Sequence, residues 1–492
     1  MSSMSRCALL PLRAASQPIP TFRSRPCAQH LQRRWRTSTT SQSFGQPTHE
    51  THPHILKQGE LTPGITALEY HHRRAALARK LPRDSSAVLA ASNVKYRSGP
   101  VFYDFHQDPN LFYLTGFDEP DAVAVIIKGQ SDVEYTFHLF VRPKDEHAEK
   151  WDGARSGVQA AKDVFNADEA DSVERVSDVL PDIIHGAREV YTDIGLHTRR
   201  STFARFFGAA SPMLDGFAKL LQNATVQKLR PLITELRLTK SKGELECMRK
   251  AGKVSGAVIT DSMRKPYKSE KQIWADLAHG FKTQGLDGEA YVPVVGGGTN
   301  ALSIHYVRND ALLKDGDMVL VDAGGEYGNY ITDITRIWPV NGKFTSAQRD
   351  MYSMILAVQR SCMSMCREDA DVSLDKLHRI AESGLKTGLK DLGFDMSQRD
   401  ALDVLFPHHV GHFIGLDVHD APGYPRTNRL KVNQCITIEP GIYVSPDDER
   451  WPAHFRGMGI RIEDSVRVGK DSVEIFTDTA LSDVDAIEAL RS

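Results

Sequence analysis

Acidic side chains stand inside several apolar, strand-like segments of the C-terminal half of the chain. Burying a carboxylate in such a strand is costly unless the group is paired with a cation or bound to a metal ion. No Lys or Arg lies between Met318 and Thr335, where two of these acids occur. A single strand acid is commonly half of a salt bridge, but several of them favour one shared site. The four acids are Asp322, Asp333, Glu439 and Glu463, in segments 318–323, 330–340, 435–439 and 459–466.

The segment 408–420 adds imidazoles to this set, from His408, His409, His412 and His419. Neutral imidazole is a good ligand for first-row metals. Carboxylates suit manganese or magnesium, and imidazole also admits cobalt, iron or zinc. Four carboxylates carry a charge that two divalent cations balance, and without cations their mutual repulsion would force protonation. The residue types therefore predict a two-metal centre, which can activate water and polarise a carbonyl group for hydrolysis.

The spacing of these residues predicts how they meet. Segments 318–323 and 330–340 flank a glycine-rich turn and are expected to form a hairpin. Asp322 and Asp333 would then lie at the same end of one ladder. Strand periodicity places Arg461 and Glu463 on one face of another strand.

The first 49 residues differ in composition from the rest of the chain. They contain seven Arg and no Lys, Asp or Glu. Such a start is typical of a mitochondrial transit peptide, which we place at residues 1–40; the alternative is a disordered basic tail. The remaining chain has 54 basic and 63 acidic residues, and a net charge of −9 offers no case for nucleic-acid binding. No apolar run is long enough for a membrane span.

Local patterns divide the rest of the chain into two domains. Residues 41–64 are expected to form a linker or arm, and residues 65–235 an α/β domain that begins with a helix at 67–81. Its expected strands are 87–92, 122–127 and 135–141. A hinge is expected at 231–240 and a helix at 242–263, within a second domain spanning 236–492. The cysteines that follow the basic segment are expected to be buried free thiols: Cys247, Cys362, Cys366 and Cys435.

Four motifs in the second domain resemble those of the aminopeptidase P group of pita-bread metallopeptidases. They are VVGGGTNALSIHY (294–306), HHVGHFIGLDVHD (408–420), IEPGIY (438–443) and GIRIED (459–464). The segment FHQDPNLFYLTGFDEP (105–120) is similar to the first domain of that group. The resemblance extends from about residue 60 onward. It implies an α/β (α+β) chain with a creatinase-like N-terminal domain followed by a pita-bread catalytic domain.

The resemblance also implies roles for individual side chains. Asp333 and Glu463 would bridge two divalent ions, most simply Mn²⁺; Asp322 would hold one ion, and His412 with Glu439 the other. Glu439 would also take a proton from the bridging water. His305 and His419 would contact the substrate carbonyl or the tetrahedral oxyanion, and Arg461 would orient the cluster. The role of His408 stays open between orientation of a ligand and packing within the loop.

The function implied is that of a metal-dependent aminopeptidase acting on peptide or protein N-termini. The chain resembles the mitochondrial Xaa-Pro aminopeptidase and intermediate-cleaving peptidase branch, which implies trimming of one residue from imported precursors after presequence cleavage. The expected location is the matrix or the matrix side of the inner membrane. A homo-oligomer, dimer or tetramer, is expected. Two alternatives are kept: a dipeptide-specific prolidase, and a non-catalytic pita-bread binding module.

Overall fold

The computed structural model describes residues 43–194, 220–221 and 224–491. The predicted transit peptide at residues 1–40 lies outside this range. Helices and strands are mixed in both halves of the described chain, which confirms the α/β class. Among the described helices, none combines the length and the apolar character that crossing a membrane requires.

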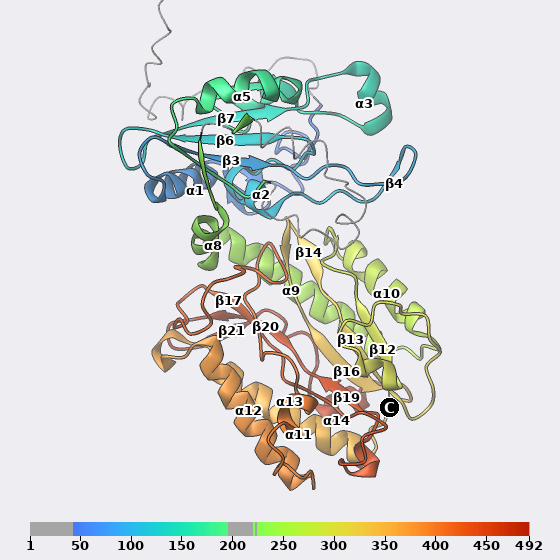
Figure 1. Ribbon diagram of the computed structural model, residues 1–492. Coiled ribbons are helices and arrows are strands. Elements are labelled where there is room, and N and C mark those ends of the chain that lie inside the picture. Colours follow the sequence, from blue (N-terminus) through green and yellow to red (C-terminus); the bar gives the residue numbers. More distant parts are fainter. Residues whose placement is uncertain (1–42, 195–219, 222–223, 492) are drawn as a thin grey trace, which may run out of the picture. The chain divides into compact units, whose positions relative to one another are not determined.

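A six-stranded mixed sheet forms the centre of the first half (Figure 1). Its order is β10-β9-β3-β6-β7-β8; β3, β6 and β7 are antiparallel neighbours, and the other pairs are parallel. The strands predicted from sequence correspond to the three antiparallel neighbours β3, β6 and β7, whose side chains are mostly buried. The strands are β3 (Ser85–Ala90), β6 (Val123–Lys128), β7 (Tyr135–Val141), β8 (Glu169–Ser172), β9 (Glu189–Thr192) and β10 (Thr225–Gln227).

Helices and short strand pairs surround this sheet. The first helix starts where the Thr66 hydroxyl accepts from the Glu69 N–H, and it ends just before Pro82, as predicted. The helices are α1 (Ala67–Lys80), α2 (Pro109–Thr115), α3 (Glu146–Asp152), α4 (Gly157–Asp163) and α5 (Val176–Ile184). The strand pairs are β1 (Glu60–Thr62) with β2 (Ile65–Thr66), and β4 (Tyr96–Ser98) with β5 (Val101–Phe102).

The segment predicted to be a hinge, 231–240, is mostly helical. Helix α8 (Arg230–Leu238) has Pro231 in its first turn, where the missing N–H of proline costs no helical hydrogen bond. The hinge prediction was therefore wrong over most of its length. Ser241 and Glu244 form a capping box that begins α9 (Lys242–Met263), and this helix was predicted correctly. The boundary expected at 235/236 falls inside α8 and stays a prediction.

Small antiparallel sheets carry the C-terminal half. Their orders are β12-β13-β16, β11-β14-β15, β17-β20-β21 and β18-β19. Figure 1 shows these strands between the pair α9 and α10 and the pair α11 and α12. The strands are β11 (Gly288–Glu289), β12 (Val294–Gly297), β13 (Met318–Asp322), β14 (Gly325–Tyr327), β15 (Tyr330–Ile331), β16 (Thr335–Pro339), β17 (Cys435–Ile438), β18 (Gly441–Tyr443), β19 (Gly459–Arg461), β20 (Asp464–Val468) and β21 (Val473–Ile475).

The core of this half lies between the sheets and the helices. Val319, Val321, Ile337, Ile436 and Ile460 are fully buried members of one apolar cluster. The helices are α10 (Glu270–Thr283), α11 (Ser346–Ser364), α12 (Leu374–Asp391), α13 (Ala401–Leu405) and α14 (Val484–Ala489). The predicted buried free thiols are confirmed at Cys247, Cys362, Cys366 and Cys435.

Candidate metal centre

Asp322 and Asp333 lie at the same end of the β13–β16 ladder. Asp322 is the last residue of β13 and pairs with Thr335 at the start of β16. The predicted hairpin is therefore present, but the long second strand is not continuous. It breaks at residues 332–334, because the Ser465 hydroxyl accepts from the Asp333 N–H (3.1 Å) and donates to the Asp333 carbonyl (2.8 Å). This exchange takes the Asp333 backbone out of the ladder.

The hydroxyl of Tyr291 lies between these two carboxylates. It is 2.6 Å from Oδ1 of Asp322 and also contacts Oδ1 of Asp333. Burial and the charge of Asp333 raise the pKa of Asp322 to about 6, against the opposing effect of Arg461. Tyr291 therefore links the two aspartates. It was not predicted from the sequence as a residue of the site.

His412 faces Asp333 and Glu439 with one ring nitrogen. Its Nε2 is 3.6 Å from Oδ2 of Asp333 and 3.5 Å from Oε1 of Glu439. Its Nδ1 lies 3.1 Å from the carbonyl oxygen of Phe413, an arrangement in which Nδ1 donates and Nε2 is free to bind a metal. Burial raises the pKa of Glu439 to about 7, although the charges of His412 and Arg461 lower it.

Glu463 lies between β19 and β20 and is buried. Its Oε2 accepts a hydrogen bond of 2.7 Å from the Thr335 hydroxyl. Its Oε1 is buried and has no hydrogen-bond partner among the described residues. Burial and the charges of Asp333 and Glu439 raise its pKa well above the usual value. An orphaned carboxylate oxygen among other carboxylates is what a cation site would leave.

Arg461 contacts the cluster through Asp322. Its Nη2 is 2.5 Å from Oδ2 of Asp322, and its Nη1 donates to the Tyr443 hydroxyl at 2.8 Å. Its Nε donates to the Thr335 hydroxyl at 3.0 Å. Arg461 and Glu463 both contact Thr335, so they lie on the same side as predicted. The predicted strand at 459–466 is not continuous, however, because it breaks at residues 462–463 between β19 and β20.

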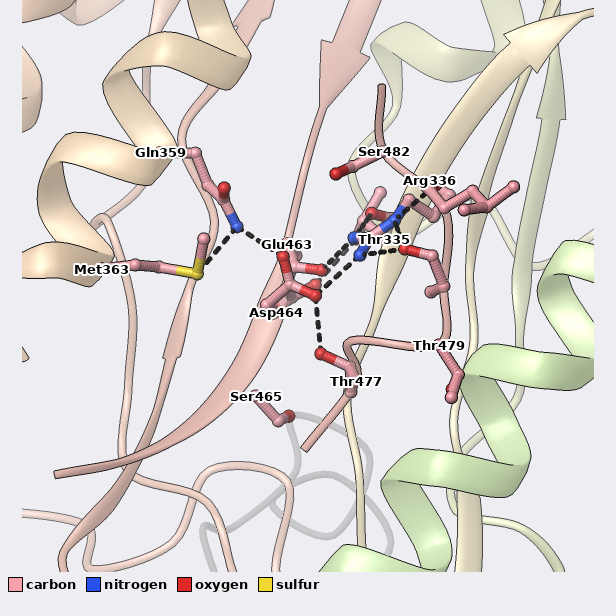
Figure 2. Close-up of polar contacts among 12 residues, drawn as sticks. Thr335, Arg336, Gln359, Met363, Glu463, Asp464, Ser465, Thr477, Thr479 and Ser482 are labelled. Atoms are coloured by element: carbon pink, nitrogen blue, oxygen red, sulfur yellow. Dashed lines mark hydrogen bonds and ion pairs between the residues drawn. The ribbon is translucent and has the colours of Figure 1, made fainter. Parts of the chain in front are cut away.

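A buried ion pair holds the backbone behind Glu463 (Figure 2). Arg336 donates to the carbonyl of Glu463 and to Oδ1 of Asp464, both at 2.6 Å. Asp464 also accepts from Gln359 and Thr477, each at 2.6 Å. Every one of these side chains is buried. The peptide that presents Glu463 is therefore fixed by a dense network of paired polar groups.

Two of the remaining histidines, His408 and His419, contact this cluster. The ring of His419 stands edge-on to that of His412, with centroids 4.4 Å apart. Burial lowers the pKa of His419, and the charges of His412 and His305 act in the same direction. His305 and His419 are exposed. His408 contacts the Tyr443 hydroxyl at 3.0 Å, and burial lowers its pKa to about 4.

The donor set fits divalent cations. Asp333, His412 and Glu463 offer one ligand atom each, and these atoms all lie within 4.8 Å of one another. Asp322 joins them through Tyr291, and Glu439 through His412. Oxygen-rich ligands with one imidazole suit manganese, magnesium, cobalt or zinc. The structure thus brings together all the acids and the histidine that the sequence predicts as ligands.

Three further residues of the site were not predicted from the sequence: Tyr291, Thr335 and Tyr443. Each is a hydroxyl that contacts a predicted ligand or Arg461. Thr335 could have been found, because it lies two residues after Asp333 and strand alternation puts it on the same side. Tyr443 ends a motif already noted, IEPGIY. Tyr291 gives no comparable signal.

Comparison with known proteins matches each half of the chain to a known protein family. The pattern of metallopeptidase family M24 matches residues 246–470, and that of the aminopeptidase P N-terminal domain matches residues 70–191. Intermediate cleaving peptidase 55 of Saccharomyces cerevisiae is 43% identical over 451 residues, which cover 90% of this chain and 88% of the yeast protein. The chain belongs to metallopeptidase family M24. Xaa-Pro aminopeptidase 3 of Homo sapiens is 36% identical, covering 91% of this chain and 90% of the human protein.

Solved structures agree with this M24 assignment. The crystal structure of Icp55 from Saccharomyces cerevisiae lacking its N-terminal 58 residues has a TM-score of 0.81 and 40% identity, covering 88% of this chain and 99% of that one. Zinc-substituted aminopeptidase P of E. coli has a TM-score of 0.78 and 32% identity, and the match covers 87% of this chain and 98% of the E. coli chain. The predicted aminopeptidase P resemblance and the pita-bread fold are confirmed. This M24 protein is a metalloaminopeptidase of the Xaa-Pro aminopeptidase type.

Proposed function

We propose that this enzyme uses a two-metal centre to hydrolyse the first peptide bond of polypeptides and to release one N-terminal residue. The observation that carries the proposal is the convergence of Asp333, His412 and Glu463, with one oxygen of Glu463 unpaired within the described part of the chain. Asp322 and Glu439 flank this group and bring the number of carboxylates to four. Two divalent cations would balance their charge, and Mn²⁺ is our first candidate.

The proposed roles follow from the position of each side chain. Asp333 and Glu463 would contact both metal ions, Asp322 one of them, and His412 with Glu439 the other. Two such ions, when bound, supply an activated water and a polarised carbonyl. Glu439 would accept the proton from the attacking water. Arg461 would keep Asp322 ionised and oriented through the contact of 2.5 Å.

His305 and His419 are proposed to bind the substrate carbonyl and the oxyanion. Both side chains are exposed, so a substrate can reach them. The ring of His419 lies edge-on to that of His412, with centroids 4.4 Å apart, so His419 stands next to a proposed metal ligand. His408 contacts Tyr443, which in turn contacts Arg461, and this chain of contacts favours an orienting role for His408.

We further propose that the substrates are mitochondrial precursors trimmed after presequence cleavage. Relatives named intermediate cleaving peptidase 55 occur in two yeasts and in Arabidopsis thaliana, and the plant protein's name includes "mitochondrial". The Arg-rich, acid-free segment that begins the chain supports import. The matrix or the matrix side of the inner membrane is the proposed location.

The expected homo-oligomer gains support from one surface feature. The β4–β5 hairpin and the residue after it expose Tyr96, Val101, Phe102 and Tyr103, each more than half accessible. Adjacent exposed apolar side chains of this kind are typical of protein interfaces. Sedimentation of the purified enzyme before and after Phe102→Ser tests this: a smaller species is expected for the variant, and a monomeric unsubstituted enzyme would contradict the expectation.

The deciding experiment compares substrate classes. Purified enzyme with Mn²⁺ is given Xaa-Pro tripeptides, Xaa-Pro dipeptides, and presequence stubs that begin with Tyr, Leu or Phe. Release of the first residue from the stubs supports precursor trimming. Cleavage confined to dipeptides would identify a prolidase instead. No cleavage of any substrate, together with no bound metal, would favour the non-catalytic binding module.

A further inference from the structure

A buried carboxylate outside the metal centre lies against the loop that carries His305. Glu270 is the first residue of α10, and its side chain is fully buried (0% exposed). Among the described residues, its carboxylate accepts four hydrogen bonds, all from neutral donors and none from a cation. A buried carboxylate is costly to keep unless its oxygens are satisfied, so this arrangement calls for an explanation.

All four donors belong to the segment that surrounds His305. Oε1 of Glu270 accepts from the Gly297 N–H at 2.9 Å and from the Asn300 amide at 2.8 Å. Oε2 accepts from the Tyr306 hydroxyl at 2.9 Å and from the Ala311 N–H at 2.8 Å. Two donors precede His305 and two follow it. One carboxylate therefore holds both ends of this loop, residues 297–311.

A second buried side chain ties the same loop to the sheet. Asn309 is fully buried (0% exposed) and has φ +51°, a left-handed conformation that asparagine tolerates. Its Oδ1 accepts from the Val295 N–H at 2.9 Å, and its Nδ2 donates to the Pro293 carbonyl at 2.8 Å. These bonds join the loop to β12, which pairs with β13, the strand that ends in Asp322.

The loop also lies tightly on β19. A Cβ atom at Gly459 would come within 2.5 Å of the Ala301 carbonyl oxygen, so only glycine permits this approach. Gly459 begins β19, and Arg461 ends that strand. The inner side of the loop is thus fixed by buried polar groups and close packing, while His305 is exposed on the outside.

We propose that Glu270 is a positioning residue for His305. It fixes the 297–311 loop so that the imidazole stays at the edge of the metal centre. The inference rests on the proposed function, in which His305 contacts the substrate carbonyl. In Glu270→Gln the amide nitrogen cannot accept a hydrogen bond, so two of the four donors lose their partner. The loop then has more freedom, and His305 loses its defined place.

A double-mutant cycle tests the coupling between Glu270 and His305. We expect Glu270→Gln to lower kcat/KM by about tenfold in the otherwise native enzyme loaded with Mn²⁺, mainly through kcat. In the His305→Ala background the same change should cost no more than about twofold, because its effect passes through the missing imidazole. The assay follows release of leucine from a Leu-initiated peptide. An equal loss in both backgrounds would overturn the proposal.

Hydrogen exchange gives a readout that does not depend on activity. Peptides covering 297–311 should exchange faster in Glu270→Gln, since the Gly297 and Ala311 amides both donate to this carboxylate. Unchanged exchange would also overturn the proposal. Glu244→Gln is the matched control: Glu244 is a buried acid in the first turn of α9 that accepts from Ser241 and Tyr330. This control should leave exchange of the loop and kcat/KM unchanged.

Two further results separate the possible failures. If Glu270→Gln does not fold, Tyr306→Phe removes a single donor to the same carboxylate and should give a smaller change of the same sign, whereas no change in loop exchange would contradict the proposal. Full activity of His305→Ala would contradict the proposed role of His305, and the positioning role with it. An inactive His305→Ala enzyme alongside a fully active Glu270→Gln enzyme would overturn the role of Glu270 alone.

Discussion

The Thr335 hydroxyl donates a hydrogen bond of 2.7 Å to one oxygen of Glu463, while the other oxygen has no partner among the described residues. The same hydroxyl accepts from Arg461 at 3.0 Å. A hydroxyl has one hydrogen, so the bond from Arg461 leaves that hydrogen for Glu463. The relay from Arg461 through Thr335 thus fixes which oxygen of Glu463 is free to bind a cation.

Removing this hydroxyl should weaken metal binding. We expect Thr335→Val, which keeps the shape of the side chain, to lower Mn²⁺ affinity by about 10-fold to 100-fold. Thr335→Ser keeps the hydroxyl and should bind Mn²⁺ nearly as the unsubstituted enzyme does. Calorimetric titration of the metal-free proteins measures both. Equal affinity of the Val and Ser variants would show that the relay has no such role.

Neutralising a ligand should stop turnover without unfolding the protein. Asp322→Asn and Glu463→Gln keep side-chain size, and we expect each to lower kcat/KM by more than about 100-fold, beyond the loss typical for residues that only support a ligand. Circular dichroism should remain that of the native fold. A fully active Glu463→Gln enzyme would contradict the proposed bridging role of this residue.

The ion pair behind Glu463 should matter for stability. Asp464→Asn leaves the buried guanidinium of Arg336 without its counter-charge, and breaking a buried pair in this way costs about 3–5 kcal/mol of unfolding free energy. Denaturant unfolding measures this. Asp310→Asn is the control, because the pair of Arg308 with Asp310 is exposed and its loss should have little effect. Similar unfolding curves for both variants would contradict the prediction.

Stability should also fall in mildly alkaline solution. His106 lies 3.0 Å from Glu326, and this contact raises the pKa of His106 to about 9, against the opposing effect of burial. Since the pKa in the folded state is above the unfolded value of about 6.5, the stabilisation is complete below pH ~6.5 and is lost as the pH rises through about 9. The contribution is modest, because the side chain of His106 is half exposed.

The measurement is the unfolding midpoint at pH 6.5, 8 and 9.5 for the unsubstituted enzyme and for His106→Asn. The difference between the two proteins should shrink as the pH rises. A difference that stays constant over this range would mean that the His106–Glu326 contact does not titrate as described.

Much of the metal centre could be predicted because carboxylates are rare in apolar strands. Asp322, Glu439 and Glu463 each stand out against their neighbours for that reason. The break at 332–334 could not be predicted, because Ile331, Thr332 and Ile334 all favour strand, and the interruption is due to Ser465, a residue distant in sequence. Long-range hydroxyl contacts of this kind leave no periodic signal.

The hinge expected at 231–240 shows a different limit of prediction from sequence. Pro231 suggested an interruption of regular structure, although proline is also common in the first turn of a helix. Glu270 is a second residue whose role the local sequence does not reveal. As the first acidic residue of a helix it looks like an ordinary favourable charge at a helix N-terminus, and only the tertiary structure shows the loop that it holds.

Metal stoichiometry tests the central claim most directly. The purified enzyme is loaded with Mn²⁺, freed of excess metal, and analysed by mass spectrometry for bound manganese per chain, alongside Glu463→Gln. We predict two ions per chain in the active enzyme and fewer in the variant, with activity following occupancy. One ion per chain at full activity, or full activity of the metal-free protein, would contradict it.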